Sequence, residues 1–138
     1  MSMRGNVKRT RKEGQLTFLN KAEKIIFYTF QVTNNTKKYP KKWRFTLTNR
    51  IQEKALEIYH NLLHANEIYP KTQKDAERRF ELQELAIVNC KELDFFIRFS
   101  FHKGMISERQ LKFWSSLTTE LRTIIAGWYN NDKIRFKF

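Results

Sequence analysis

The sequence predicts an all-α protein folded as an antiparallel four-helix bundle. Apolar residues recur at intervals of three and four along four long segments, which is the spacing of an amphipathic helix. Only four Gly and two Pro interrupt the 138 residues, so the elements are expected to be long. A hydrophobic fraction of 41% supports a packed core, and the length fits a single domain.

The first helix is expected from Leu16 to about Asn35. Its β-branched and aromatic residues would also suit a strand, but the length of the segment favours a helix. Residues 1–14 are polar and basic, and we expect them to form a flexible arm that is disordered when unbound. The stretch NNTKKYP after the helix indicates a loop. The apolar face of this helix is expected to consist of Phe18, Ala22, Ile25, Ile26, Thr29 and Val32.

A dense motif, YPKKWRFTLTNRI at Tyr39–Ile51, leads into the second helix. Pro40 has a fixed φ and no N–H, so the chain at the start of the motif is expected to be extended. Thr46 or Thr48 is expected to cap the helix, because a hydroxyl can accept a bond from an unpaired N–H of the first turn. Phe45 precedes the helix and is expected to staple onto its first turn.

The second helix is predicted over about Leu47–Ile68, with an apolar seam at alternating four- and three-residue steps. The third is expected to begin after Thr72, whose side chain can cap the first turn, and to end near Lys103, where Gly104 closes it. Around Phe95–Phe101 this helix is apolar on more than one face, which indicates contacts with more than one neighbour.

Ser107 and Gln110 have the spacing of a capping box and begin the fourth helix. We expect this helix to run to about Asn130, where Asn130-Asn131-Asp132 breaks it. The predicted organisation is thus a basic arm at 1–14, a four-helix bundle at 15–130 and a short basic tail at 131–138.

Candidates for catalysis are few, and neither an enzyme nor a metal or cofactor site is expected. His60 and His64 stand four apart and could share a metal, but a histidine zinc site normally needs a third ligand. Cys90 lies on the inward face of the third helix and is expected to be a core residue. Glu77, Glu81 and Glu84 share one side of that helix without the Glu-x-x-His motif of di-iron bundles. No apolar run is long enough to span a membrane, and we expect a cytoplasmic protein.

The charge is segregated along the chain. Lys and Arg total 27 against 14 Asp and Glu, a net charge of +13. Residues 1–44 hold 12 Lys and Arg against 2 Glu, while residues 45–138 hold 15 against 12. This excess favours a polyanionic partner, with solubility or an anionic membrane surface as the alternatives.

Basic residues interleaved with aromatic rings are what sequence-tolerant nucleic-acid binding requires, since cations neutralise phosphates and rings offer stacking faces. In the motif, Lys41, Lys42 and Arg44 are expected to face phosphate, while Phe45, Thr46, Leu47 and Ile51 are expected to begin the bundle. The predicted nucleic-acid-binding residues are Arg4, Lys8, Arg9, Arg11, Lys12, Lys37, Lys38, Lys41, Lys42, Arg44, Arg78, Arg79, Lys133, Arg135 and Lys137.

The motif resembles the accessory variability determinant family, which is found beside reverse transcriptases in diversity-generating retroelements. Members share a phrase like FP-basic-x-x-RFTL-x-x-RI, matched here by Tyr39-Pro40, Arg44-Phe45-Thr46-Leu47 and Arg50-Ile51. The likeness continues through Arg78-Arg79 to Gly127-Trp128 and covers about residues 20–130. Thr48-Asn49 stands where a glycine-acid pair is expected. Four-helix proteins encoded in ribosomal RNA intervening sequences can carry comparable cores.

The resemblance implies a four-helix bundle that assembles as a homopentameric basic barrel. It implies a non-catalytic accessory protein that binds the partner reverse transcriptase and RNA, or an RNA–cDNA hybrid, during adenine-mutagenising cDNA synthesis. The alternative is a structural oligomer of the intervening-sequence type, which docks an acidic protein partner through its charge.

Overall fold

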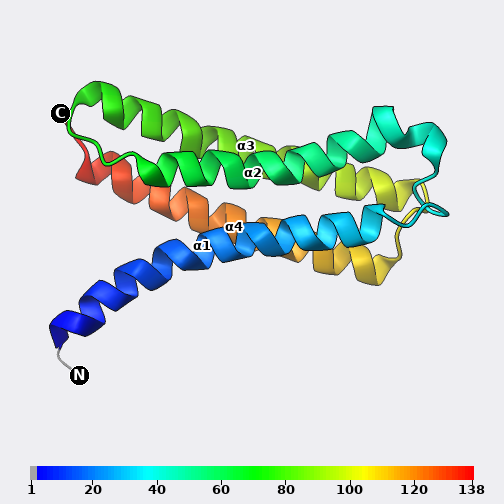
Figure 1. The fold of residues 1–138 in the computed structure, drawn as a ribbon, viewed down its shortest axis with the longest axis horizontal. Helices are drawn as coiled ribbons and strands as arrows, with labels where there is room; N and C mark the ends of the chain where they lie inside the picture. The colour runs from blue at the N-terminus through cyan, green and yellow to red at the C-terminus, as the bar shows by residue number, and fades with distance from the viewer. Residues whose placement is uncertain (1–2) are drawn as a thin grey trace.

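The computed structural model describes the backbone from Met3 to Phe138 and the side chains from Thr17 onward. Within these residues the chain forms four α-helices, α1 (Met3–Thr33), α2 (Asn49–Glu67), α3 (Gln73–His102) and α4 (Glu108–Arg135). Each helix packs against two neighbours, in the cyclic order α1, α2, α3, α4 (Figure 1). The predicted all-α bundle is therefore confirmed for the described residues.

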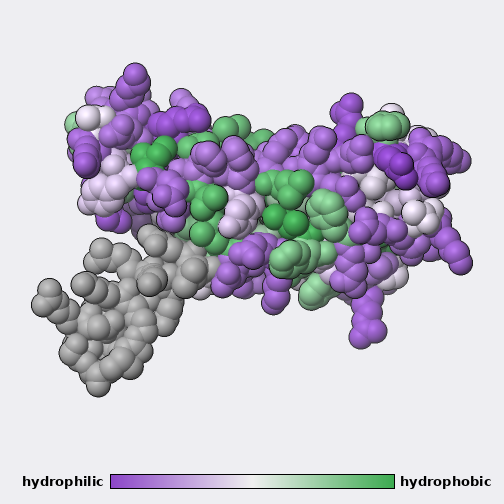
Figure 2. Space-filling model, in the orientation of Figure 1, coloured by the Kyte–Doolittle hydropathy of each residue, from purple (hydrophilic) through white to green (hydrophobic). Residues whose placement is uncertain are grey.

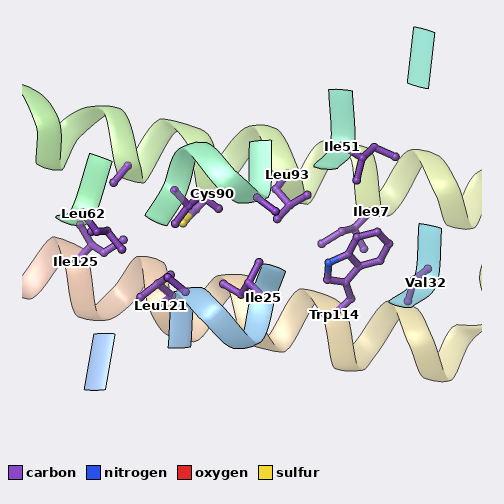
Figure 3. Close-up of a cluster of buried hydrophobic side chains, with 14 of the residues drawn as sticks. Ile25, Val32, Ile51, Leu62, Cys90, Leu93, Ile97, Trp114, Leu121 and Ile125 are labelled. Atoms are coloured by element: carbon purple, nitrogen blue, oxygen red, sulfur yellow. The ribbon is translucent and has the colours of Figure 1, made fainter. Parts of the chain in front are cut away.

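The core is built from the apolar stripes that the sequence predicts. Ile25, Ile58, Leu93 and Leu121, one from each helix, are fully buried. Figure 3 shows core side chains from α1, α3 and α4 pointing toward one another between the helices. Burial of each such side chain contributes about 1.5–3 kcal/mol, so this seam holds the four helices together. Trp114 is also fully buried.

The ends of the bundle differ from the prediction. α1 begins at Met3 and not at Leu16, so the backbone of the predicted flexible arm lies largely within this helix. Five of the twelve residues 3–14 are Arg or Lys, which are good helix formers, and this favours continuation of the helix. α4 continues through the predicted break and ends at Arg135.

The continuation of α4 has a tertiary cause. Asp132 and Phe136, both in the predicted tail, are buried. The carboxylate of Asp132 accepts hydrogen bonds from α3, which compensates for the low helix propensity of Asn and Asp.

The predicted caps of α3 and α4 are confirmed. The Thr72 hydroxyl accepts a bond from the N–H of Asp75 at 3.2 Å. Ser107 and Gln110 exchange both bonds of a capping box, at 3.1 and 2.8 Å. Gly104 follows α3 with a φ of +72°, the left-handed conformation in which glycine is least strained.

The entry to α2 differs from the prediction. After an extended Pro40, with φ −69° and ψ 158°, a short 3₁₀ turn (η1, Lys41–Trp43) passes into a π-helical turn (η2, Arg44–Thr48). Thr48 is already helical and its side chain makes no capping bond, so the predicted threonine cap is wrong. The preceding turns supply carbonyl partners, such as that of Arg44 to the N–H of Asn49, and these replace a hydroxyl cap.

None of the helices in the described part of the chain is both long and apolar enough to cross a membrane.

Candidate nucleic-acid interface

The loop between α1 and α2 is held rigid by Asn35. Its side-chain oxygen accepts bonds from the N–H groups of Lys37 and Lys38 at 3.1 and 3.3 Å, and its carbonyl accepts one from Tyr39 at 2.7 Å. The Tyr39 ring is buried in the core. Asparagine commonly stabilises turns in this way, and here the turn fixes two lysines at one end of the bundle.

A cavity of about 560 Å³ opens beside this loop. Lys42 Nζ lies 5.8 Å from the centroid of the Trp43 ring, and Lys103 Nζ lies at the same distance from the Phe99 ring. Lys103 stands at the end of α3, where a cation complements the free carbonyls of the last turn. The cavity is lined by Lys37, Lys38, Pro40, Lys42, Trp43, Thr46, Leu47, Phe99, Lys103, Gly104 and Met105.

The charge in this cavity is unbalanced. Of the described residues that line it, four are lysines and none is acidic. None of these four ammonium groups takes part in an ion pair with a residue in the range 17–138. Burial raises the pKa of nearby Tyr39 to about 12, so its hydroxyl stays neutral and adds no negative charge. The cavity is therefore positive and open to an anion.

Lys41 and Arg44 lie on the adjoining surface. Both are exposed, and together they border a second hollow next to Pro40. We call Lys37, Lys38, Lys41, Lys42, Arg44 and Lys103 the basic end.

Phe45 does not lie where the sequence predicts it. Its side chain is 80% exposed, so it does not staple onto the first turn of α2. The π-helical turn changes the rotation per residue, and this separates Phe45 from the buried positions Leu47 and Ile51. Thr46 is exposed as well, so only the second half of the predicted scaffold segment enters the core.

Arg79 is used inside the protein. Its side chain is 8% exposed, and its Nε donates to Asp132 Oδ2 at 2.7 Å. Its Nη1 donates to the carbonyl of Ile68 at 2.7 Å, and the guanidinium lies 5.0 Å from the centroid of the Trp128 ring. Arg79 therefore joins α3 to α4 and to the end of α2, and its guanidinium is not available to an external phosphate.

The other described cations that the sequence predicts to bind nucleic acid lie at the opposite end of the bundle. Arg78 is exposed and pairs with Glu81 at 3.4 Å. Lys133 lies over the rings of Phe80 and Tyr129, Arg135 lies over Tyr69 and Phe136, and Lys137 is exposed.

The distance between the two ends follows from helix geometry. Arg79 and Lys103 bracket most of α3, which at 1.5 Å per residue separates them by about 36 Å. The structure therefore does not bring the predicted cations into one patch. The side chains of Arg4, Lys8, Arg9, Arg11 and Lys12 lie outside the described residues.

The candidates for catalysis lie apart from the basic end. Cys90 is buried, and this burial raises the pKa of its thiol to about 12, which keeps it protonated and unreactive. The rings of His60 and His64 lie 4.2 Å apart between centroids. From Thr17 to Phe138, no cluster of three or more His, Cys, Asp or Glu could hold a metal ion.

One wall of the cavity was not predicted from the sequence. Phe99 and Lys103 complete the cavity wall, but they lie far along the chain from Trp43 and on a helix end that looked purely structural. The helices also expose apolar side chains outside this interface, of which the sequence indicated only the stretch around Phe95–Phe101. On the α-helices they are Phe27, Leu56, Leu85, Val88, Phe95, Phe101, Phe113 and Ile134. Figure 2 shows apolar side chains gathered among hydrophilic ones on one face of the bundle.

No protein-family model, curated protein or solved structure matches this chain.

Proposed function

We propose that this protein is a non-catalytic RNA-binding subunit that accompanies a reverse transcriptase of a diversity-generating retroelement. The observation that carries the RNA-binding part is the basic end, where four lysines without carboxylate partners in the described chain surround an exposed tryptophan. The assignment to a reverse transcriptase rests on the resemblance of the Tyr39–Ile51 motif. The proposal places the protein in the cytoplasm with that enzyme and its template.

The basic end suits RNA because its charge and its ring lie together. Unpaired lysines can neutralise backbone phosphates, and this releases counterions and gives affinity without sequence preference. Trp43, with 45% of its surface exposed, can offer a face on which a base stacks.

Assembly into a homopentamer is part of the same proposal. Exposed apolar side chains such as Phe27, Leu85 and Phe95 would be covered by contacts between copies. Analytical ultracentrifugation of the full chain should then give about five times the 16.8 kDa of one chain. A monomer at micromolar concentration would contradict this part alone.

Salt titration of RNA binding tests the central claim. For single-stranded RNA, each neutralised phosphate contributes about 0.7 to the slope of log affinity against log salt concentration. Lys41→Glu, Lys42→Glu and Arg44→Glu together should reduce this slope by about 2 and should leave the far-UV circular dichroism unchanged.

The control for this experiment changes the net charge by the same amount elsewhere. Lys71, Lys74 and Lys91 are exposed, on α3 or just before it, and lie outside the basic end. Their combined replacement by Glu should lower the slope by less than half as much. RNA binding that is absent, or that is insensitive to salt, would refute the proposed function.

The exposed apolar side chains also favour a second candidate, a structural oligomer that docks an acidic protein. This candidate predicts that nuclease-treated protein still captures its partner at high salt. The first candidate predicts instead that capture of the reverse transcriptase weakens when RNA is removed. A neighbouring reverse transcriptase gene beside two repeats that differ at adenines would favour the first candidate.

A further inference from the structure

The cavity lined by Trp43, Leu47 and Phe99, here named the Trp43 cavity, has the volume of a small-molecule site. Its volume of about 560 Å³ falls within the roughly 300–1,000 Å³ typical of such sites. Leu47, Phe99 and Met105 provide apolar lining, and Trp43, which also lines the cavity, has almost half of its surface exposed. A planar apolar group can therefore enter beside the indole.

The backbone at Trp43 is constrained by local hydrogen bonds. The backbone N–H of Trp43 donates to the carbonyl of Pro40 at 2.9 Å, and the next residue, Arg44, begins the π-helical turn. The backbone that carries the indole therefore needs no ordering on binding, which lowers the entropic cost of stacking on this ring.

The cations are arranged around this ring. Lys37 and Lys38 reach the cavity from the Asn35 turn, Lys42 from η1, and Lys103 from the end of α3. Four ammonium groups exceed the charge of one phosphodiester, so the cavity suits a planar base carried on a backbone with more than one phosphate.

A double helix presents such a ligand poorly. In an A-form duplex the bases are stacked on one another, and aromatic side chains reach them only in loops, bulges and ends. A cavity that takes up an unstacked base would therefore distinguish single-stranded from double-stranded RNA, whereas lysines on a flat surface would bind both.

We propose that the Trp43 cavity holds one unpaired nucleotide of single-stranded RNA, with its base on Trp43 and its flanking phosphates on Lys37, Lys38, Lys42 and Lys103. This inference rests on the proposed RNA-binding function and names the form of RNA that the basic end selects. It gives the protein a preference for loops or strand ends.

Fluorescence anisotropy with the full chain tests the proposal. The probes are a labelled single-stranded 12-mer of mixed sequence and a duplex of the same length. Trp43→Leu should weaken binding of the single strand about 10-fold, through loss of base stacking, and should leave duplex binding within about 2-fold. Trp43→Phe, which keeps a stacking face, should restore most of the loss.

Matched variants separate the cavity from its surroundings. Phe45→Leu removes a more exposed ring outside the cavity and should leave both affinities unchanged. Lys103→Ala should weaken single-strand binding more than Lys91→Ala, which removes an equal charge elsewhere on α3. An equal loss of single-strand affinity in Trp43→Leu and Phe45→Leu would overturn the proposal. An equal loss in Lys103→Ala and Lys91→Ala would do the same.

The remaining outcomes are distinct. Undiminished single-strand binding by Trp43→Leu would overturn this inference and leave the proposed function intact, whereas failure of the native protein to bind either RNA would refute the proposed function itself. A free nucleotide is tested with AMP. If micromolar AMP quenches tryptophan fluorescence and Trp43→Leu leaves RNA affinity unchanged, the cavity binds a free nucleotide and the proposal is overturned.

Discussion

Arg79 and Asp132 form a buried ion pair that fastens the start of α3 to the end of α4, with 2.7 Å between Nε and Oδ2. Gln83 donates to the same carboxylate oxygen at 2.7 Å, and the carbonyl of Ile68 accepts from Arg79. The carboxylate therefore has two donors, which offsets the cost of removing its charge from water. The pair explains why α4 continues past the predicted break.

Removal of one partner should destabilise the protein strongly. Asp132→Ala leaves a buried guanidinium without its counter-charge, and we expect a loss of about 3–5 kcal/mol in the free energy of unfolding. Urea denaturation followed by circular dichroism measures this loss. Arg78→Ala is the matched control, because that arginine makes an exposed pair with Glu81 and should cost less than about 1 kcal/mol. Equal losses in the two variants would show that the buried pair is not the fastening element.

Two glycines should respond to alanine with opposite signs. Gly104 has a φ of +72°, so Gly104→Ala should lower the free energy of unfolding by about 1–2 kcal/mol even though no atom crowds the new methyl group. Gly127 lies inside α4, also with open space around it, so Gly127→Ala should raise stability by about 0.5–1 kcal/mol. Thermal denaturation of both variants gives the comparison. A stabilised Gly104→Ala would contradict the turn geometry.

The protein should lose stability at alkaline pH. Burial raises the pKa of Cys90 from 9.0 and that of Tyr39 from 10.0, in each case to about 12. Above the unfolded pKa of each group and below about 12, the unfolded chain has released a proton that the folded chain retains. The free energy of unfolding therefore falls as the pH rises from about 9 to 12. Each group contributes a slope of up to about 1.4 kcal/mol per pH unit.

Denaturation midpoints measured from pH 7 to 11 follow this effect. Tyr39→Phe and Cys90→Ala should each flatten the decline above pH 9, whatever their effect on stability at pH 7. An unchanged decline in both variants would mean that other groups cause it.

Much of the fold could be read from local sequence. The caps at Thr72 and Ser107 and the turn at Gly104 depend on residues three or four apart, so their pattern was visible. The entry to α2 was not visible in the sequence, because a π-helical turn has no amino-acid composition that separates it from an α-helix. That turn decided the exposure of Phe45.

The candidate site was predictable in part. Lys37, Lys38 and Lys42 stand out as a basic cluster around an aromatic residue. The opposite wall of the cavity, at Phe99 and Lys103, could not be predicted. Nothing in the sequence near these residues indicates that α3 ends against the α1–α2 loop. The same reasoning misplaced Arg79, which resembles its exposed neighbour Arg78 in sequence but faces the core.

The sequence by itself determined four amphipathic helices, their main caps and an excess of positive charge, because helical periodicity and capping are short-range properties. Only the tertiary structure decided which cations are free to meet a ligand. A lysine or arginine can bind a ligand when it is neither paired with a carboxylate nor buried in the core. The packing of helices that are distant in sequence decides which cations are paired or buried. Packing left Lys42 and Lys103 around one cavity and placed Arg79 in the interior.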